Sequence, residues 1–238
     1  VAITITNVNE APSVTSGGTA SFAENGTGTA YTVTGSDPDA GTTLSYSISG
    51  TDAALFNIDS STGAVTFKTA PDFESPQDAG ANNVYDITVT ASDGTLSASK
   101  SVAITVTNVN EAPSVTSGGT ASFAENGTGT AYTVTGSDPD AGTTLSYSIS
   151  GTDAALFNID STTGAITFRS SPDFENPHDA GGNNVYDLVV SVSDGTTSAT
   201  KAVAITVTDV ADTGSGADTT APVVNAGQGF SYAENRAA

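Results

Sequence analysis

An exact internal repeat constrains this chain more than any other feature of its sequence. Residues 7–60 recur letter for letter as residues 108–161, an offset of 101 residues. Beyond that stretch the copies differ by mild changes, such as Lys68 to Arg169, and the apolar phase is kept. A period of this length marks one folding unit per copy. We therefore expect tandem domains built to one plan.

The repeat also predicts the domain boundaries. Residues 9–109 and 110–210 are expected to form the two complete repeats. Residues 1–8 match the end of a repeat, because residues 1–6 resemble residues 102–107. Residues 211–238 are expected to hold a linker and the start of a third repeat, since residues 230–235 echo residues 123–126. The chain opens without Met or a charged leader, so we expect a piece of a larger protein.

Within each copy, the apolar residues alternate with a period of two. Tyr85, Ile87, Val89 and Ala91 share one face, and clusters of Gly, Asn, Asp and Pro separate such runs. About seven strands in about 100 residues are typical of a β-sandwich. The pattern predicts an all-β fold of tandem, Greek-key, seven-stranded sandwiches with no long helix. The expected strands are 13–16 or 20–23, then 29–35, 43–50, 55–59, 64–68, 84–92 and 97–107, and their equivalents 101 residues later.

The charge balance narrows the possible partners. The chain holds 26 Asp and Glu against 5 Lys and Arg, a formal net charge of −21. Nucleic acids and anionic membranes are poor partners for such a chain, whereas cations are good ones. Disorder is disfavoured because 37% of the residues are hydrophobic and fall in alternating runs. No stretch is long and apolar enough to insert into a membrane.

The residues that enzymes commonly use are scarce. There is no Cys, and the one His, His178, stands where the other copy has Gln77. Ser and Thr are spread along strands rather than placed on a nucleophile turn. We therefore expect no enzymatic activity.

An ordered set of acidic motifs resembles the cadherin repeat family, and more closely its bacterial relatives in large secreted adhesins. The resemblance covers nearly the whole chain, and the order and spacing of its motifs carry it. These motifs are Ala23-Glu24-Asn25, Asp37-Pro38-Asp39, Leu55-Phe56-Asn57-Ile58-Asp59, Asp72-Phe73-Glu74, Ala91-Ser92-Asp93 and the junction Asn108-Val109-Asn110-Glu111-Ala112-Pro113.

The resemblance implies calcium as the cofactor, bound where one repeat meets the next. Calcium takes six to eight oxygen ligands, so several loops must contribute. Carried over by motif, the expected ligands are Glu24, Asp72 and Glu74 from the first repeat, Asn108, Asn110 and Glu111 from the linker, and Asp138, Asp140 and Asp194 from the second repeat.

The linker departs from the family pattern, because Asn108 occupies the leading Asp position and one later residue is missing. Two consequences stay open: fewer than three ions, or a backbone carbonyl or water in place of a carboxylate. We expect two to three ions. A second junction with Glu125, Asp173 and Glu175 leads into Asp209 and is expected to be empty or partly filled.

Some acidic residues are expected to have no metal role. Asp59, Asp78, Asp86 and Asp153 are assigned to solvated surface or turns, since Asp is common in turns. The long segment 75–83 is expected to be a mobile loop.

Two functions fit the sequence. The first is an extracellular, calcium-rigidified structural or adhesive segment of a cell-surface or secreted protein, with homophilic contacts or another surface protein as partner. The alternative is a carbohydrate-binding accessory module of a polysaccharide-active protein. The lack of Trp and the inward phase of Tyr31, Tyr46, Tyr85 and Phe56 weaken the alternative.

Overall fold

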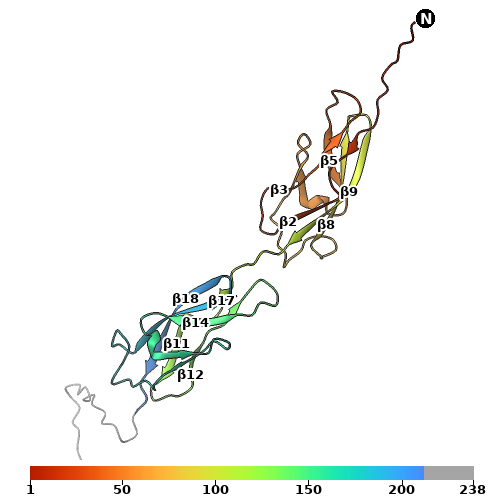
Figure 1. Ribbon diagram of the computed structural model, residues 1–238. Helices are drawn as coiled ribbons and strands as arrows, with labels where there is room; N and C mark the ends of the chain where they lie inside the picture. The colour runs from red at the N-terminus through yellow and green to blue at the C-terminus, as the bar shows by residue number, and fades with distance from the viewer. Residues whose placement is uncertain (212–238) are drawn as a thin grey trace, which may run out of the picture. The chain divides into compact units, whose positions relative to one another are not determined.

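The structure, a computed structural model, describes residues 1–211. It divides into two compact units, of which the first is Val1–Glu111 and the second begins at Ala112 (Figure 1). The expected start of a third repeat at residues 230–235 lies outside the described residues. Each unit is described by itself below.

The first unit is built almost entirely from strands. They are β1 (Ser13–Val14), β2 (Thr19–Ala23), β3 (Thr29–Thr32), β4 (Gly35–Ser36), β5 (Ser45–Ser49), β6 (Phe56–Ile58), β7 (Ala64–Phe67), β8 (Val84–Ser92) and β9 (Ser97–Thr107). A short 3-10 helix, η1 (Ala53–Leu55), precedes β6.

The second unit repeats this order 101 residues later. Its elements are β10 (Ser114–Val115), β11 (Thr120–Ala124), β12 (Thr130–Thr133), β13 (Gly136–Ser137), β14 (Ser146–Ser150), η2 (Ala154–Leu156), β15 (Phe157–Ile159), β16 (Ala165–Phe168), β17 (Val185–Ser193) and β18 (Ser198–Thr208).

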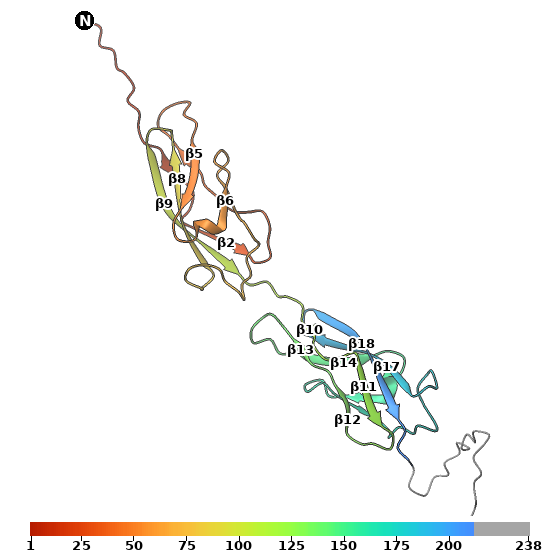
Figure 2. The ribbon, with the colours of Figure 1, turned by 180° about the vertical axis from the view of Figure 1, so that it is seen from behind.

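Each unit is a sandwich of two main sheets, as Figures 1 and 2 show. In the first unit a four-stranded sheet has the order β2-β9-β8-β5, and a three-stranded sheet has the order β3-β7-β6. β2 runs parallel to β9, whereas the other pairs are antiparallel. The non-sequential order agrees with a Greek key. The predicted fold class, tandem all-β sandwiches, is confirmed.

The strand boundaries differ from the prediction near the start of each repeat. The expected alternatives 13–16 and 20–23 are both present, as β1 and β2. They are separated at Gly17 and Gly18, where the chain leaves its pairing with β4 and begins to pair with β9. The expected strand 29–35 likewise divides into β3 and β4.

Residues 1–6 form no strand, although they resemble a strand end. Their counterparts, residues 102–107, lie in β9 between β2 and β8. No such pair of strands flanks residues 1–6 within the described part of the chain, and Val1, Ile3 and Ile5 are exposed. A strand needs a partner, so the assignment of these residues to the end of a preceding repeat stays a prediction.

Aromatic side chains fill the core as their phase predicts. Tyr31, Phe56 and Tyr85 are buried, and Tyr46 packs against the core. The ring of Phe67 lies 4.3 Å from that of Phe56 and 5.0 Å from that of Tyr85, between centroids. Offset and edge-on contacts of this kind stabilise a core beyond simple burial.

The segment 75–83 contradicts two expectations. Asp78, expected at the surface or in a turn, begins a turn but is only 5% exposed, and it accepts N–H groups of Asn82 and Asn83 at 3.0 Å. Asp52 is also buried and accepts the N–H of Ala79 at 2.9 Å. Buried carboxylates that accept backbone donors hold a loop in place, so a mobile excursion does not fit this segment.

The second unit repeats this arrangement. Asp153, expected at the surface or in a turn, lies in a turn but is buried and accepts the N–H groups of Ala180 and Asp187. The surface assignments of Asp59 and Asp86 agree with the structure, since both side chains are exposed.

Candidate metal centre

Three carboxylates meet at the end of the first unit that leads into the linker. Glu24, Asp72 and Glu74 each offer a carboxylate oxygen, and these oxygens lie within 4.8 Å of one another. Asp72 and Glu74 flank Phe73 in the segment before β8, whereas Glu24 follows β2. The structure therefore brings together the three ligands predicted from the first repeat. We call this set the first triad.

Glu24 is the most constrained member of the first triad. It is 2% exposed, and its two carboxylate oxygens accept the N–H groups of Phe73 at 2.6 Å and Val109 at 2.8 Å. The turn that positions it depends on Asn25, whose φ of 56° is a left-handed conformation that Asn tolerates. The two backbone donors therefore fix the orientation of this buried carboxylate.

Asp72 organises the short loop beside Glu24. One of its oxygens accepts the N–H groups of Glu74 at 2.9 Å and Ser75 at 3.0 Å. This local pattern is common for Asp in turns. It uses one oxygen of Asp72 and fixes the direction of the backbone that carries Glu74.

The predicted linker ligands are connected to the same end of the unit. Asn25 donates its side-chain amide to Glu111 Oε1 at 2.9 Å, and Asn110 donates its amide to the carbonyl of Glu111 at 3.1 Å. Together with the bond from Val109 to Glu24, these contacts place the linker backbone beside the first triad. Asn108 precedes Val109 directly.

The predicted ligands of the second repeat are described within the second unit alone. The backbone N–H of Asp140 donates to Asp138 Oδ1 at 2.9 Å. Asp194 follows β17 and accepts N–H groups of Thr196 and Thr197. The other oxygen of Asp138, Oδ2, is buried without a hydrogen-bond partner. Such an oxygen requires compensation, and a cation would supply it.

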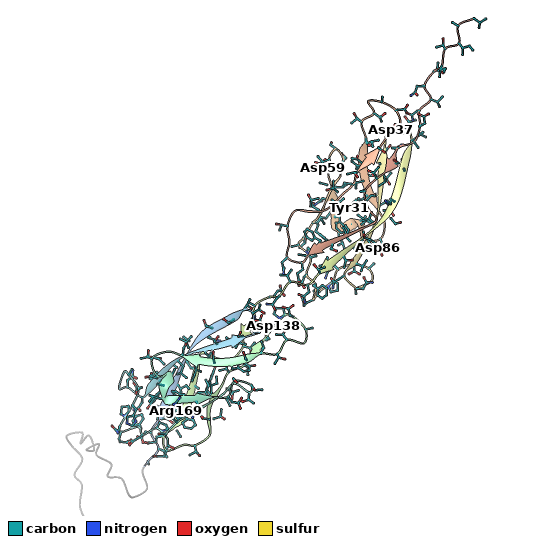
Figure 3. All side chains as sticks on the ribbon, in the orientation of Figure 1. Tyr31, Asp37, Asp59, Asp86, Asp138 and Arg169 are labelled. Atoms are coloured by element: carbon teal, nitrogen blue, oxygen red, sulfur yellow. The ribbon has the colours of Figure 1, made fainter. Side chains whose placement is uncertain are left out.

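At the equivalent end of the first unit, the N-terminal segment donates hydrogen bonds to two acidic side chains. Asn9 donates to Asp93 Oδ2 at 2.8 Å, and the N–H of Glu10 donates to Asp39 Oδ2 at 2.9 Å. Asn7 also donates to Asp39. Asp37 Oδ2 is buried without a hydrogen-bond partner, like its counterpart Asp138 Oδ2. Figure 3 shows Asp37 at the end of the unit that carries the N-terminal segment.

At this end of the first unit, the pKa values of Asp39 and Glu10 are shifted in opposite directions. The N–H of Glu10 and the amide of Asn7 lower the pKa of Asp39, because they stabilise the carboxylate. Desolvation raises the pKa of Glu10, and the neighbouring charge of Asp39 raises it further. The repulsion between such neighbours is the electrostatic strain that a bound cation relieves.

A second triad lies at the corresponding end of the second unit. Its members are Glu125, Glu175 and Asp209, whose offered oxygens lie within 4.8 Å of one another. The N–H groups of Val210 and Phe174 lower the pKa of Glu125, whereas desolvation raises that of Glu175. Sequence reasoning assigned Asp173 here and did not include Asp209 among the ligands. The available signal was position: Asp209 stands 101 residues after Asn108, where it restores the acidic residue.

The donor set determines which ions fit. Both triads consist of carboxylates, and amide and backbone oxygens lie beside the first triad. Hard cations such as Ca²⁺ and Mg²⁺ prefer oxygen ligands of this kind, and Ca²⁺ tolerates irregular geometry with six to eight ligands. The donor chemistry of each triad therefore fits a hard divalent cation.

Comparison with known proteins shows which chains resemble this one in sequence and in fold. No family model matches the chain. The chain is 32% identical to Protocadherin Fat 4 of Homo sapiens over an alignment of 202 residues. The match covers 79% of this chain and 4% of that protein. Human Protocadherin-24 EC1-2 (form II) superposes with a TM-score of 0.62 at 21% identity, covering 86% of this chain and 100% of that structure.

A further solved structure agrees. Drosophila N-cadherin EC1-4 superposes with a TM-score of 0.60 at 23% identity, covering 84% of this chain and 50% of that structure. These comparisons indicate cadherin repeats. Within residues 1–211, no helix is sufficiently long and apolar to cross a membrane.

Proposed function

We propose that this chain is a calcium-binding, non-enzymatic segment of an extracellular protein, and that its repeats serve a structural or adhesive role. The observation that carries the proposal is the first triad, in which Glu24, Asp72 and Glu74 present oxygens within 4.8 Å of one another. Three carboxylates this close repel one another unless a cation lies between them.

The acidic ends of the two units support calcium at further positions. Asp138 Oδ2 in the second unit and Asp37 Oδ2 in the first are buried without hydrogen-bond partners. We propose that Asp138, Asp140 and Asp194 bind calcium in the second unit, and that Asn108, Asn110 and Glu111 contribute linker oxygens beside the first triad. The number of ions stays a prediction of two to three.

The comparisons support the biological setting. The resemblance to cadherin repeats implies an extracellular setting. The exact copying of residues 7–60 is typical of long repeat arrays. We therefore place this segment at the cell surface or in a secreted protein. The finer assignment to a bacterial adhesin, with homophilic contacts or another surface molecule as partner, rests on the sequence motifs.

Calcium titration of the purified chain by isothermal calorimetry tests the proposal. We expect saturable binding with a Kd of about 0.1 to 1 mM, the order of extracellular calcium modules. Glu74→Ala should weaken binding several-fold, because it removes a triad carboxylate. Asp59→Ala, which removes an exposed turn carboxylate outside the triad, is the matched control.

Two results would contradict this proposal. One is the absence of calcium binding at millimolar concentrations, together with an unchanged melting temperature in chelator. The other is an equal loss of affinity in Glu74→Ala and Asp59→Ala, which would show that total charge rather than the first triad attracts the ion.

A further inference from the structure

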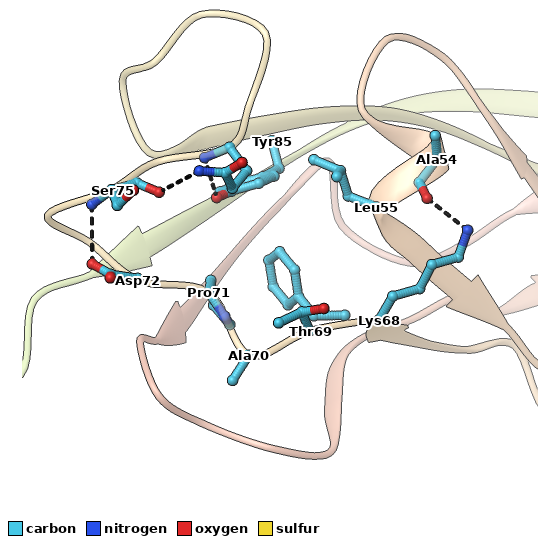
Figure 4. A pocket seen from close by; sticks show the side chains of 11 residues that line it. Ala54, Leu55, Lys68, Thr69, Ala70, Pro71, Asp72, Ser75 and Tyr85 are labelled. Carbon is cyan, nitrogen blue, oxygen red and sulfur yellow. Dashed lines mark hydrogen bonds between the residues drawn. The ribbon is translucent and has the colours of Figure 1, made fainter.

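A cavity of about 570 Å³ opens in the first unit beside η1, the end of β7 and the loop that follows β7 (Figure 4). Small-molecule sites typically enclose about 300 to 1,000 Å³. The lining residues all belong to the first unit. The cavity is therefore large enough for a small ligand and does not depend on the second unit.

The floor of the cavity is apolar and rigid. Phe67 lines it while its ring packs inward against Phe56 and Tyr85, with centroid separations of 4.3 Å and 5.0 Å. Leu55 and Pro71 extend this apolar surface. A ligand that lies against the floor meets side chains already fixed by the core, so little conformational entropy is lost there.

The rim of the cavity is polar and carries both signs of charge. Figure 4 shows Lys68 and Asp72 on opposite sides. The Lys68 ammonium donates to the carbonyl of Ala54 at 2.6 Å, which fixes the side chain at the rim. Neutral hydrogen-bonding side chains, Ser75 and Gln77 among them, complete the rim. The rim thus offers donors and acceptors together.

The combination of floor and rim selects a class of ligand. A ligand of single charge would be attracted to one side of the rim and repelled by the other. A hydroxyl group instead accepts from an ammonium and donates to a carboxylate, so a neutral ring with several hydroxyls satisfies both Lys68 and Asp72. The C–H face of such a ring can lie on Phe67. We propose that this cavity binds a neutral hexose unit of a glycan.

The second repeat keeps the floor and changes the rim. Leu156, Phe168 and Pro172 retain the residue types of the first repeat at equivalent positions. By contrast, 5 of the 11 lining residues are replaced: Lys68, Thr69, Ala70, Ser75 and Gln77 become Arg169, Ser170, Ser171, Asn176 and His178. Residues that vary on a constant scaffold are those that set ligand preference.

This inference goes beyond the proposed calcium function and shares one residue with it, because Asp72 lines the cavity and also belongs to the first triad. The test is a titration of the ¹⁵N-labelled chain with the methyl glycosides of glucose, galactose and mannose, followed by the amide shifts of residues 67–77. We expect saturable shifts with a millimolar Kd for at least one glycoside. Lys68→Gln should weaken that binding about five-fold or more, an order expected from losing a charged hydrogen-bond donor.

Lys100→Gln provides the matched control. The Lys100 ammonium also donates to a backbone carbonyl, that of Ser16 at 2.6 Å, but Lys100 does not line the cavity. Its replacement should leave the affinity for the glycoside unchanged. Equal losses in the two variants would overturn the proposal, because they would indicate a general charge effect.

Two further results would overturn the proposal. One is the absence of saturable shifts for all three glycosides, both in calcium and in chelator. The other is tighter binding of glucuronate than of the neutral glycosides, which would assign the cavity to anions. A separate calcium titration, followed at Glu24 and Glu74, decides the metal proposal, so either proposal can fail without the other.

Discussion

The backbone N–H of Val109 donates to Glu24 Oε1 at 2.8 Å, and this bond ties the chain after β9 to a buried carboxylate of the first triad. Glu24 also accepts the N–H of Phe73 through its second oxygen. One side chain thus connects the end of β2, the loop that carries Asp72 and Glu74, and the linker. Its charge and its hydrogen bonds should have separable effects.

Glu24→Gln separates them. Gln keeps one acceptor oxygen and loses the negative charge, so we expect calcium affinity to fall about ten-fold or more, since each lost carboxylate weakens a calcium site. Stability in chelator should fall by about 1 to 3 kcal/mol, because one partly buried N–H loses its acceptor. Calorimetric titration and thermal melts with and without calcium measure the two effects.

Asp86→Asn is the control for this variant, because Asp86 is exposed and lies outside the first triad. It should change neither quantity appreciably. If Glu24→Gln binds calcium as tightly as the parent chain does, Glu24 is a structural carboxylate and not a ligand.

Asp52→Ala should destabilise the first unit strongly. Asp52 is buried and accepts the N–H of Ala79 at 2.9 Å and the N–H of Asp86 at 2.7 Å. Its removal leaves two partly buried donors without their acceptor, at a cost of roughly 2 to 4 kcal/mol. The urea-unfolding transition of the first unit measures this loss of unfolding free energy.

Asp86→Ala is the matched comparison, because it removes an exposed carboxylate and leaves the N–H of Asp86 bonded to Asp52. We expect it to cost less than about 1 kcal/mol. Similar costs in the two variants would show that the network around Asp52 contributes little to the stability of the loop.

The sequence predicts the regular part of the fold well. The predicted strands 84–92 and 97–107 coincide with β8 and β9, because long alternation and burial on one face reinforce each other. The split between β1 and β2 could not be predicted, since it depends on which distant strand each segment pairs with. Residues 1–6 show the converse, because they alternate but have no partner strand among residues 1–211.

The candidate site was predictable only in part. The first triad follows from ordered motifs, which place Glu24 and Asp72 at one end of a sandwich. The sequence assigns Asp78 and Asp153 to the surface or to turns, because Asp is common in turns. Their burial depends on side chains and backbone groups that meet only in the folded unit. Asp209 differs from these two residues, because its position 101 residues after Asn108 was a signal in the sequence itself.

Gly63→Ala should be among the most damaging small substitutions in the first unit. Gly63 has a φ of 74°, and a Cβ at this position would lie 2.2 Å from the carbonyl oxygen of Val33. That carbonyl is on the backbone and cannot move freely, so the clash adds to the strain of a left-handed conformation. We expect a loss of roughly 3 kcal/mol or more, measured by urea unfolding.

Gly94→Ala isolates the conformational part of this cost. Gly94 has a φ of 97°, but a Cβ there would meet nothing within 4 Å. We expect a loss of about 1 to 2 kcal/mol from backbone strain alone. If both variants lose the same stability, the close approach of Val33 to Gly63 has no energetic consequence.

Acid should weaken the first unit through Asp59. The N–H groups of Thr62 and Ser61 lower the pKa of Asp59 from its ordinary value of 3.8, because they stabilise the charged carboxylate in the folded state. The stabilisation is therefore complete above pH 3.8 and is lost as the pH falls through the lower pKa of the folded state.

Asp59→Asn keeps the shape of the side chain and removes its titration. The difference in unfolding free energy between the parent chain and this variant should be constant above about pH 5 and shrink below pH 3.8. Asp160→Asn, at the equivalent turn of the second unit, should show the same behaviour in that unit's transition, because hydrogen bonds from Thr163 and Thr162 lower the pKa of Asp160 in the same way. Urea unfolding between pH 2.5 and pH 6 measures both differences, and a difference that does not vary with pH would contradict the assignment of these turns as acid-sensitive elements.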